Sequence, residues 1–163
     1  DLSRDRVGVG RLRPPNVEYV RAEPNMPLPE FSRPGPFKAV VILDAELSPE
    51  WRHAVGKWLL DSGCLYLMAW GSDCEAFHDA VDYANISAFP NYEVPDEKFV
   101  MTTWHENESL EEVFWFSQFC AEFSYNEEKL PRTMILHVSN QDREAEIFDL
   151  FDQASTLVDR EPD

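Results

Sequence analysis

Four side chains that can exchange protons or act as nucleophiles come directly after apolar runs of the sequence. Asp44 follows AVVIL, Cys74 follows CLYLMAWGSD, and His105 and Glu106 follow FVMTTW. A cysteine beside a histidine and a carboxylate is the arrangement that hydrolases and transferases use for nucleophilic catalysis. Because Cys74 is expected near a helix start, unpaired backbone N–H groups would favour its thiolate. These residues therefore form a candidate catalytic site.

The immediate neighbours of Cys74 also support a purely structural role. Asp73 and Glu75 flank this cysteine, and nearby negative charges raise the pKa of a thiol. Under this interpretation, Cys74 is a partly buried residue at the start of a helix. The sequence leaves both roles open.

A metal ion or a nucleotide cofactor finds less support. His105, His137, Asp44 and Glu106 have the ligand types of zinc, iron and manganese sites. No short spacing such as HxxxH joins the histidines, and the apolar neighbours of His137 favour a core position. Neither GxGxxG nor a P-loop follows an apolar run, so no phosphate cradle is present. We expect no metal and no cofactor.

The elements that position these side chains form four strand-then-helix units. The expected strands are residues 39–43, 64–70, 99–104 and 133–138. The helix signals are Ser48 with Pro49, then Ser72 with Glu75, then Ser109 with Glu112, and a last start near Asp142, while Gly63 ends the first helix. Strands that are apolar on both faces and alternate with helices imply a mainly parallel sheet covered on both sides.

We therefore predict one α/β domain over residues 37–163, a three-layer, doubly wound fold of the flavodoxin-like or Rossmann-like type. Its sheet would have four strands in the order 2-1-3-4. Ligands of such sheets bind beyond the carboxyl ends of the strands, where the strand order reverses. With this order, Asp44 would face Thr103, His105 and Glu106 across the crevice.

Residues 1–36 have a different composition from the rest of the chain. They contain seven of the 12 prolines, a density that opposes both helices and central strands. We predict an extended arm, which Val17, Tyr19, Val20 and Phe31 would allow to lie along the domain or along a second subunit. The third helix is apolar almost all round, so a homodimer through the arm or this helix is compatible with the sequence.

The net charge of −17 belongs to the region after the arm. Residues 1–36 hold six arginines against five acids, whereas residues 37–163 hold eight basic residues against 26 acids. Such a field repels nucleic acid and anionic membranes and attracts basic proteins, although an acidic surface also serves solubility alone. No apolar run spans a bilayer, no signal peptide is recognisable, and the three cysteines are scattered. We expect a cytoplasmic protein.

Trp70 and Trp104 close two of the expected strands. Exposed tryptophans often anchor partner proteins, and an aromatic core at the sheet edge is the alternative. They stand in the segments CLYLMAWGSDC and FVMTTWHENESLEEVFWF, which together with TMILHVS resemble a small bacterial family of uncharacterised proteins that share a domain of unknown function. The resemblance covers about residues 37–151. It implies a bacterial, cytosolic setting and assigns no catalytic residue.

Two functional hypotheses follow. The first is a non-enzymatic, acidic interaction module that docks on a basic partner in an inhibitor, immunity-type or assembly role, with Trp70 and Trp104 as candidate partner-binding residues. The alternative is a small hydrolase or transferase that uses Cys74, His105 and Asp44 or Glu106.

Overall fold

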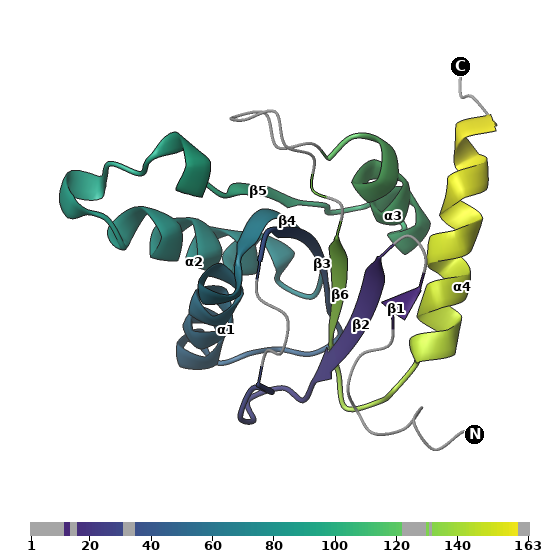
Figure 1. Ribbon diagram of the computed structural model, residues 1–163. Coiled ribbons are helices and arrows are strands. Elements are labelled where there is room, and N and C mark those ends of the chain that lie inside the picture. The colour runs from purple at the N-terminus through teal and green to yellow at the C-terminus, as the bar shows by residue number, and fades with distance from the viewer. Residues whose placement is uncertain (1–11, 14–15, 31–34, 122–129, 131, 160–163) are drawn as a thin grey trace.

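The computed structural model describes residues 12–13, 16–30, 35–121, 130 and 132–159. Figure 1 shows the strands and helices of these residues. The strands are β1 (Leu12–Arg13), β2 (Val17–Ala22), β3 (Phe37–Leu43), β4 (Cys64–Gly71), β5 (Met101–Trp104) and β6 (Thr133–Val138). The helices are α1 (Pro49–Ser62), α2 (Cys74–Ser87), α3 (Leu110–Phe119) and α4 (Glu144–Ala154), with short 3-10 helices η2 (Pro90–Tyr92), η3 (Asp96–Lys98) and η4 (Ser155–Asp159).

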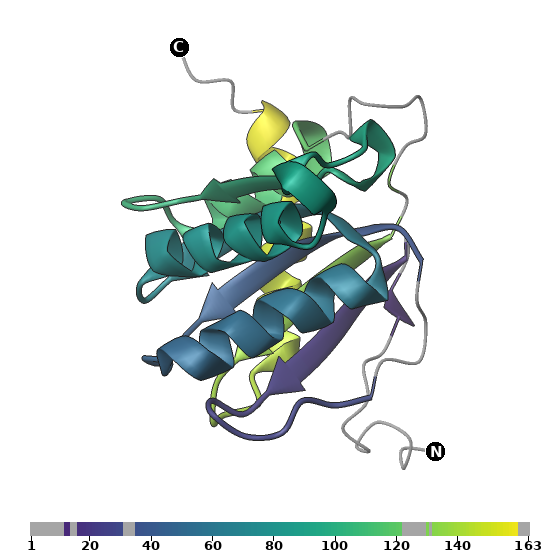
Figure 2. The same ribbon diagram turned by 90° about the vertical axis from the view of Figure 1, so that its left-hand side faces the viewer.

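The described strands form one sheet in the order β1-β2-β6-β3-β4-β5. β1 runs antiparallel to β2, and the other five strands are parallel to one another. Figures 1 and 2 show α1 and α2 on one face of the sheet and α3 and α4 on the other. The predicted α/β class, with helices on both sides of a parallel sheet, is confirmed.

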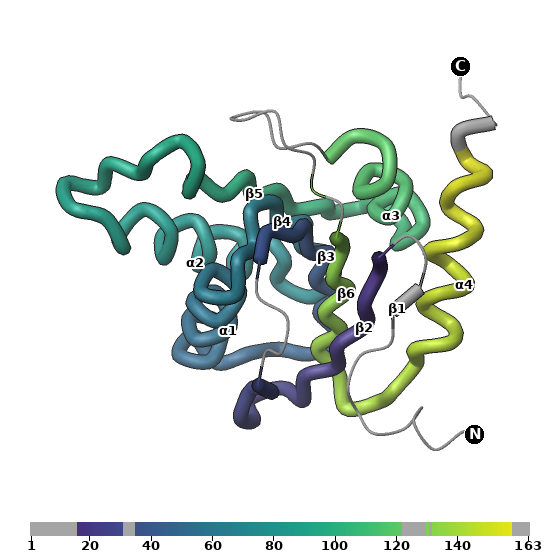
Figure 3. Tube along the Cα trace, viewed as in Figure 1, coloured from purple at the N-terminus to yellow at the C-terminus, as the bar shows by residue number. Residues whose placement is uncertain are grey.

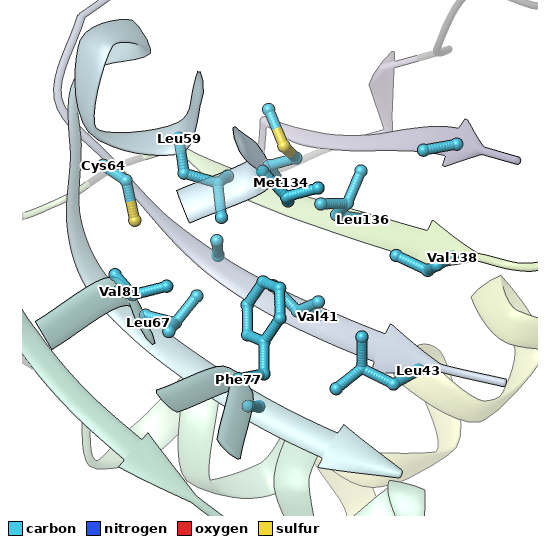
Figure 4. Packing of buried hydrophobic residues seen from close by; sticks show 14 of the residues in the cluster. Val41, Leu43, Leu59, Cys64, Leu67, Phe77, Val81, Met134, Leu136 and Val138 are labelled. Atoms are coloured by element: carbon cyan, nitrogen blue, oxygen red, sulfur yellow. The ribbon is translucent and has the colours of Figure 1, made fainter. Parts of the chain in front are cut away.

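The core consists of one apolar cluster on each face of the sheet. On the α1 and α2 side, Leu59 and Phe77 pack on strand residues such as Val41 and Leu136, as Figure 4 shows. On the other side, Phe114 of α3 and Phe148 of α4 pack on the opposite face of the same strands. Every residue of β6 is buried, because this strand has neighbours on both edges and helices on both faces.

The segment predicted to be an arm supplies part of the sheet. Val17–Ala22 forms β2, which pairs along its whole length with β6. The predicted number of four strands and the exclusion of a central strand from this segment are therefore wrong. The prolines of the segment flank residues 16–23 and leave them free to donate every ladder hydrogen bond. Phe31 and residues 1–11 lie outside the described residues.

The predicted strand order 2-1-3-4 is also wrong. The four expected strands are arranged as β5-β4-β3-β6, which is third, second, first, fourth. Figure 3 traces the chain outward from β3 through β4 to β5, after which α3 returns it past β3 to β6. The order reverses between β3 and β6, and not between β3 and β5. Crossovers of similar length serve either arrangement, so hydropathy patterns do not distinguish them.

Two of the three predicted capping signals are confirmed, and α4 begins at Glu144, close to the start expected near Asp142. Ser48 accepts a hydrogen bond from the Trp51 amide, and Ser109 and Glu112 form the expected capping box. The box predicted at Ser72 is wrong, because α2 begins after Asp73, whose side chain makes no capping hydrogen bond. Ser72 instead donates its backbone N–H to the carbonyl of Leu43, which keeps this residue on the end of the sheet.

The turn that precedes Ser72 depends on Gly71. This residue has a φ of +111°, and a Cβ added to it would lie 2.3 Å from the carbonyl oxygen of Leu43. We predict that Gly71→Ala lowers the free energy of unfolding by about 1–3 kcal/mol or more, since both the backbone conformation and the space exclude a side chain.

Urea denaturation followed by circular dichroism measures this effect. Gly56→Ala is the matched control, because Gly56 lies inside α1 and the new methyl group would make an ordinary contact of 3.4 Å with Val81. That variant should be neutral or more stable, as alanine favours helix. Equal losses for the two variants would contradict the role assigned to Gly71.

Candidate functional site

A hydrogen-bonded chain of polar side chains lies at the ends of β3 and β6. His137 of β6 lies 2.8 Å from the Tyr19 hydroxyl through Nδ1, and 2.6 Å from an Asp44 oxygen through Nε2. The same Asp44 oxygen accepts a hydrogen bond of 2.8 Å from Arg143, at the start of α4. Beside this chain, Arg21 donates to the carbonyl of Ser139. Side chains from β2, β6, β3 and α4 therefore meet at the point where the strand order reverses.

The hydrogen bonds determine where the protons of this chain lie. Asp44 is ionised at neutral pH and only accepts, so Nε2 of His137 must carry the proton that it shares with Asp44. A neutral imidazole then has a bare Nδ1, which accepts the hydroxyl proton of Tyr19. The order of donation is therefore Tyr19 to His137 to Asp44.

Burial and charge shift the pKa values of all three groups. Burial lowers the pKa of His137 below its ordinary value of 6.5, although the hydrogen bond to Asp44 acts in the opposite direction. Burial by itself would raise the pKa of Asp44, but the hydrogen bonds from His137 and Arg143 outweigh it and keep this pKa below the ordinary 3.8. Burial, followed by the charge of Asp142, raises the pKa of Tyr19 to about 12.

The order of donation is that of the hydroxyl, imidazole and carboxylate in serine hydrolases, but the hydroxyl is not accessible. Tyr19 is only 3% exposed and packs with its ring against Phe148. The His137 side chain is 0% exposed. These hydrogen bonds therefore satisfy the buried ring of His137 and join β2 and α4 to the centre of the sheet. They do not present a nucleophile to a substrate.

Cys74 and His105 do not form the predicted catalytic pair. Cys74 packs in the apolar cluster on the α1 and α2 side of the sheet and is 3% exposed. The ring of His105 lies 5.1 Å from that of Phe116 of α3, on the other side. Asp44 is separated from His105 by strand order, because β4 lies between β3 and β5.

The ring nitrogens of His105 also bond to residues other than Cys74. Its Nε2 lies 2.9 Å from the Thr103 hydroxyl, and its Nδ1 lies 3.0 Å from a carboxylate oxygen of Glu108. Both ring nitrogens are thus occupied by neighbours in the chain. Burial raises the pKa of Cys74, and the charge of Glu106 raises it further, despite opposing backbone hydrogen bonds. This environment favours the thiol over the nucleophilic thiolate.

An acidic hollow of about 360 Å³ lies where β4 ends and α2 begins. Its lining consists of Gly71, Asp73, Cys74, Glu75, Ala76, Asp79 and Glu106. Four of these seven residues are acidic and none is basic, so the hollow is a strongly negative part of the surface. The predicted site residues Cys74 and Glu106 both line it, but neither has a histidine side chain as partner within the described residues.

A larger hollow of about 800 Å³ lies beside the amino ends of β4 and β5 and the C-terminal ends of α1 and α2. Lys57, Asp61, Glu97 and Lys98 line it together with mostly apolar residues. Its basic and acidic side chains balance, and none of the predicted site residues lines it. Its lining therefore lacks the excess of negative charge that marks the acidic hollow.

The two predicted partner-binding tryptophans lie on opposite sides of the sheet. Trp70 packs against the α3 and α4 cluster and donates its indole N–H to the carbonyl of Glu108. Trp104 pairs with Ala69 in the β-ladder, and its ring lies 4.6 Å from that of His78 on α2. Trp104 is 41% exposed, so it is the tryptophan of this pair that is available to a partner.

The described residues hold neither a three-ligand group for a metal ion nor a helix that could cross a membrane. No three or more histidine, cysteine, aspartate or glutamate side chains come together there in an arrangement suited to a metal. No helix among them is both long enough and apolar enough to span a bilayer.

Comparison with known proteins identifies the family. Residues 17–154 match a family described as Domain of unknown function (DUF7684). The chain belongs to the DUF7684 family. Neither the comparison with curated proteins nor that with solved structures gave a match. The DUF7684 match begins with the first residue of β2 and ends with the last residue of α4. It therefore includes β2, and the resemblance expected over 37–151 starts too late.

Sequence reasoning missed Tyr19 and Glu108 as partners of the two histidines, and Arg143 as a partner of Asp44. The alternation in VEYVRA, with Tyr19 and Arg21 on one face, is a strand signal that the surrounding prolines concealed. Arg143 carries no comparable signal, because its contact with Asp44 spans 99 positions of this DUF7684 chain. Only the adjacency of β3 and β6 brings these residues together.

The buried histidine predicts how the stability of the DUF7684 domain depends on pH. As the pH falls, the unfolded chain protonates His137 near the ordinary pKa of 6.5, whereas the folded chain does so only at a lower pH. Protons therefore stabilise the unfolded state, and the free energy of unfolding falls as the pH decreases from about 6.5. Asp44, whose pKa is lowered from 3.8, adds a second loss at still lower pH.

Urea titrations at about pH 7 and about pH 5 test this dependence. His137→Gln, which removes the titrating ring, should lose less stability between the two pH values than the wild-type chain. His53→Gln is the control, since His53 is exposed, and it should behave like wild type. An unchanged pH dependence in His137→Gln would contradict the assignment.

The three thiols should differ in reactivity towards iodoacetamide. Cys120 is exposed, whereas burial raises the pKa of Cys64 to about 12 and also raises that of Cys74. We predict that Cys120 is alkylated first and that Cys120→Ser is nearly inert until urea unfolds it, because only thiolates react. Peptide mass spectrometry over time measures the three rates. Alkylation of Cys74 faster than that of free cysteine would restore it as a candidate nucleophile.

Proposed function

We propose that this DUF7684 domain is a non-enzymatic interaction module that binds a basic partner protein, in an inhibitor, immunity-type or assembly role. The observation that carries the proposal is the acidic hollow next to the exposed Trp104. Both features lie on α2 and the adjacent ends of β4 and β5. A negative cavity beside an exposed aromatic ring suits the insertion of a lysine or arginine side chain.

The acids of the hollow have little internal compensation. Among the described residues, Asp73, Glu75 and Glu106 form no ion pair, and Asp79 interacts only with His78. Asp73 also makes no capping hydrogen bond to α2, so its carboxylate is available. Placing four such groups together costs energy through mutual repulsion. A cationic side chain would relieve this repulsion, which is a direct source of affinity and of fast, salt-dependent association.

The enzymatic alternative receives less support from the same residues. A thiol nucleophile needs a base or a positive environment, whereas acids surround Cys74 and His105 is directed to the other side of the sheet. The unpaired cysteines Cys64, Cys74 and Cys120 fit a reducing, cytoplasmic setting in which such a module would meet its partner.

Short synthetic peptides of increasing lysine and arginine content test the proposal. The wild-type chain should bind the basic peptides and not neutral ones of the same length, and binding should weaken as NaCl rises from about 0.05 to about 0.5 M. The triple variant Asp73→Asn, Asp79→Asn, Glu106→Gln should bind at least about tenfold more weakly. Fluorescence anisotropy of labelled peptides measures each Kd.

A second triple variant separates the hollow from the total charge. Glu30→Gln, Glu50→Gln, Asp149→Asn changes the charge equally at exposed positions outside the hollow, and it should bind like wild type. Equal losses in both triple variants would show that only net charge matters. That result, or the absence of binding to any basic peptide, would refute the proposed function.

A further inference from the structure

β5 leaves one of its edges open. It is the last strand of the sheet on its side, and within the described residues it pairs only with β4. The amide of His105 donates to Ala69, so alternation along the strand turns the backbone groups of Thr102 and Trp104 away from β4. The amide of Val100, which has the same outward direction, is bonded to the side chain of Asn85. Thr102 and Trp104 are the positions that remain available.

The sequence of β5 carries none of the usual protection of an edge strand. MTTW contains no charge, no proline and no glycine, and its pairing with β4 has no register shift. Open edges of this kind pair readily with another extended chain. Figures 1 and 2 both place β5 at the margin of the sheet beside α2, so a strand could approach there in the plane of the sheet.

Acidic residues are concentrated in the segments next to β5 along the chain and on α2, which contacts this strand. They are Asp79 and Asp82 on α2, Asp96 and Glu97 in η3, and Glu106 and Glu108 after the strand, against the single base Lys98. Two copies of a chain with a net charge of −17 repel each other most strongly where such acids would meet. The same charges attract a basic strand. The edge is thereby protected against a second copy and selective for a partner of opposite charge.

The position of Asp82 indicates which side chains of an added strand would be recognised. On α2, His78 touches Trp104 and Asn85 bonds to Val100. Asp82 lies between these two on the same stripe of the helix, the stripe that faces β5 at both of these contacts. It is half-buried, and it has no ion pair among the described residues. A carboxylate and an exposed indole therefore border the edge on its α2 side.

We propose that β5 binds an extended segment of the basic partner as an added strand. The backbone of that segment hydrogen-bonds to Thr102 and Trp104, and lysine or arginine at every second position faces Asp82 and the ring of Trp104. This inference rests on the proposed function, because it names the way in which the partner docks. It adds that recognition is carried by main-chain hydrogen bonds as well as by charge.

The test uses the full chain and a synthetic peptide with lysine at alternate positions. A second peptide of identical sequence carries N-methyl groups on the backbone nitrogens of alternate residues, which removes donors and keeps the charge. Strand addition predicts that the unmodified peptide slows hydrogen exchange of the Thr102 and Trp104 amides, and that N-methylation weakens binding at least about tenfold. Because this comparison changes only the peptide, it does not depend on the folding of a variant.

Variants of the domain supply the complementary measurement. Thr102→Pro removes an outward N–H and should weaken binding, whereas Thr102→Val keeps the N–H and should bind like wild type. Asp82→Asn should reduce affinity, with Asp149→Asn as the control of equal charge. Circular dichroism confirms that each variant is folded.

The outcomes separate the two proposals. Binding that persists with N-methylation and without protection of Thr102 and Trp104 would overturn strand addition and leave the basic-partner function standing. Failure of every basic peptide to bind would overturn both. A free chain that sediments as a dimer with the Thr102 amide already protected would show that a second copy occupies β5, and it would also overturn the inference.

Discussion

The arrangement of this domain depends on satisfying one buried histidine. His137 lies at the centre of the sheet with a side chain that is 0% exposed. Each ring nitrogen left there without a hydrogen bond would cost about 1–3 kcal/mol of stability. Tyr19 and Asp44 fill its two nitrogens, and Arg143 holds Asp44 in turn. Because these partners belong to β2, β3 and the start of α4, the histidine specifies which elements must be neighbours.

The polar side chains at the switch point of the sheet bond to one another. The ends of β3 and β6 are the position where such folds commonly bind ligands. Here Arg143 and Asp44 form an ion pair of 2.8 Å, and Tyr19 is 3% exposed. These groups therefore stabilise the fold. The acidic hollow and the exposed Trp104 lie instead one and two strands away, at the ends of β4 and β5.

The acidic surface at that end follows from the same topology. β5 is the outermost strand because the chain returns across β3 after it, and an outermost strand has an open edge. Aspartates and glutamates are gathered beside this edge and in the hollow at the start of α2. In the proposed function, this one set of charges opposes self-association and favours a basic partner. The exposed ring of Trp104 provides apolar contact area at the same place.

The sequence by itself determined the parts of this protein that depend on neighbouring residues. Apolar runs located β3 to β6, and Ser48, Gly63 and the Ser109–Glu112 capping box located helix ends, because these interactions span only a few positions. The acidic character of the domain and its family resemblance also follow from the sequence alone. The start of α2 was misplaced, since Asp73 adopts a positive φ that places Ser72 on the sheet.

Only the tertiary structure decided which strands and which side chains are neighbours. Local patterns contain no information on strand order, so Asp44 was expected beside His105 and is found beside His137. The prolines on either side of β2 also concealed this strand, and with it the role of Tyr19. Cys74 and His105 each follow a strand as expected, but they are directed to opposite faces of the sheet. A contact between residues about a hundred positions apart is selected by the packing of whole elements, and that selection is made only when the chain folds.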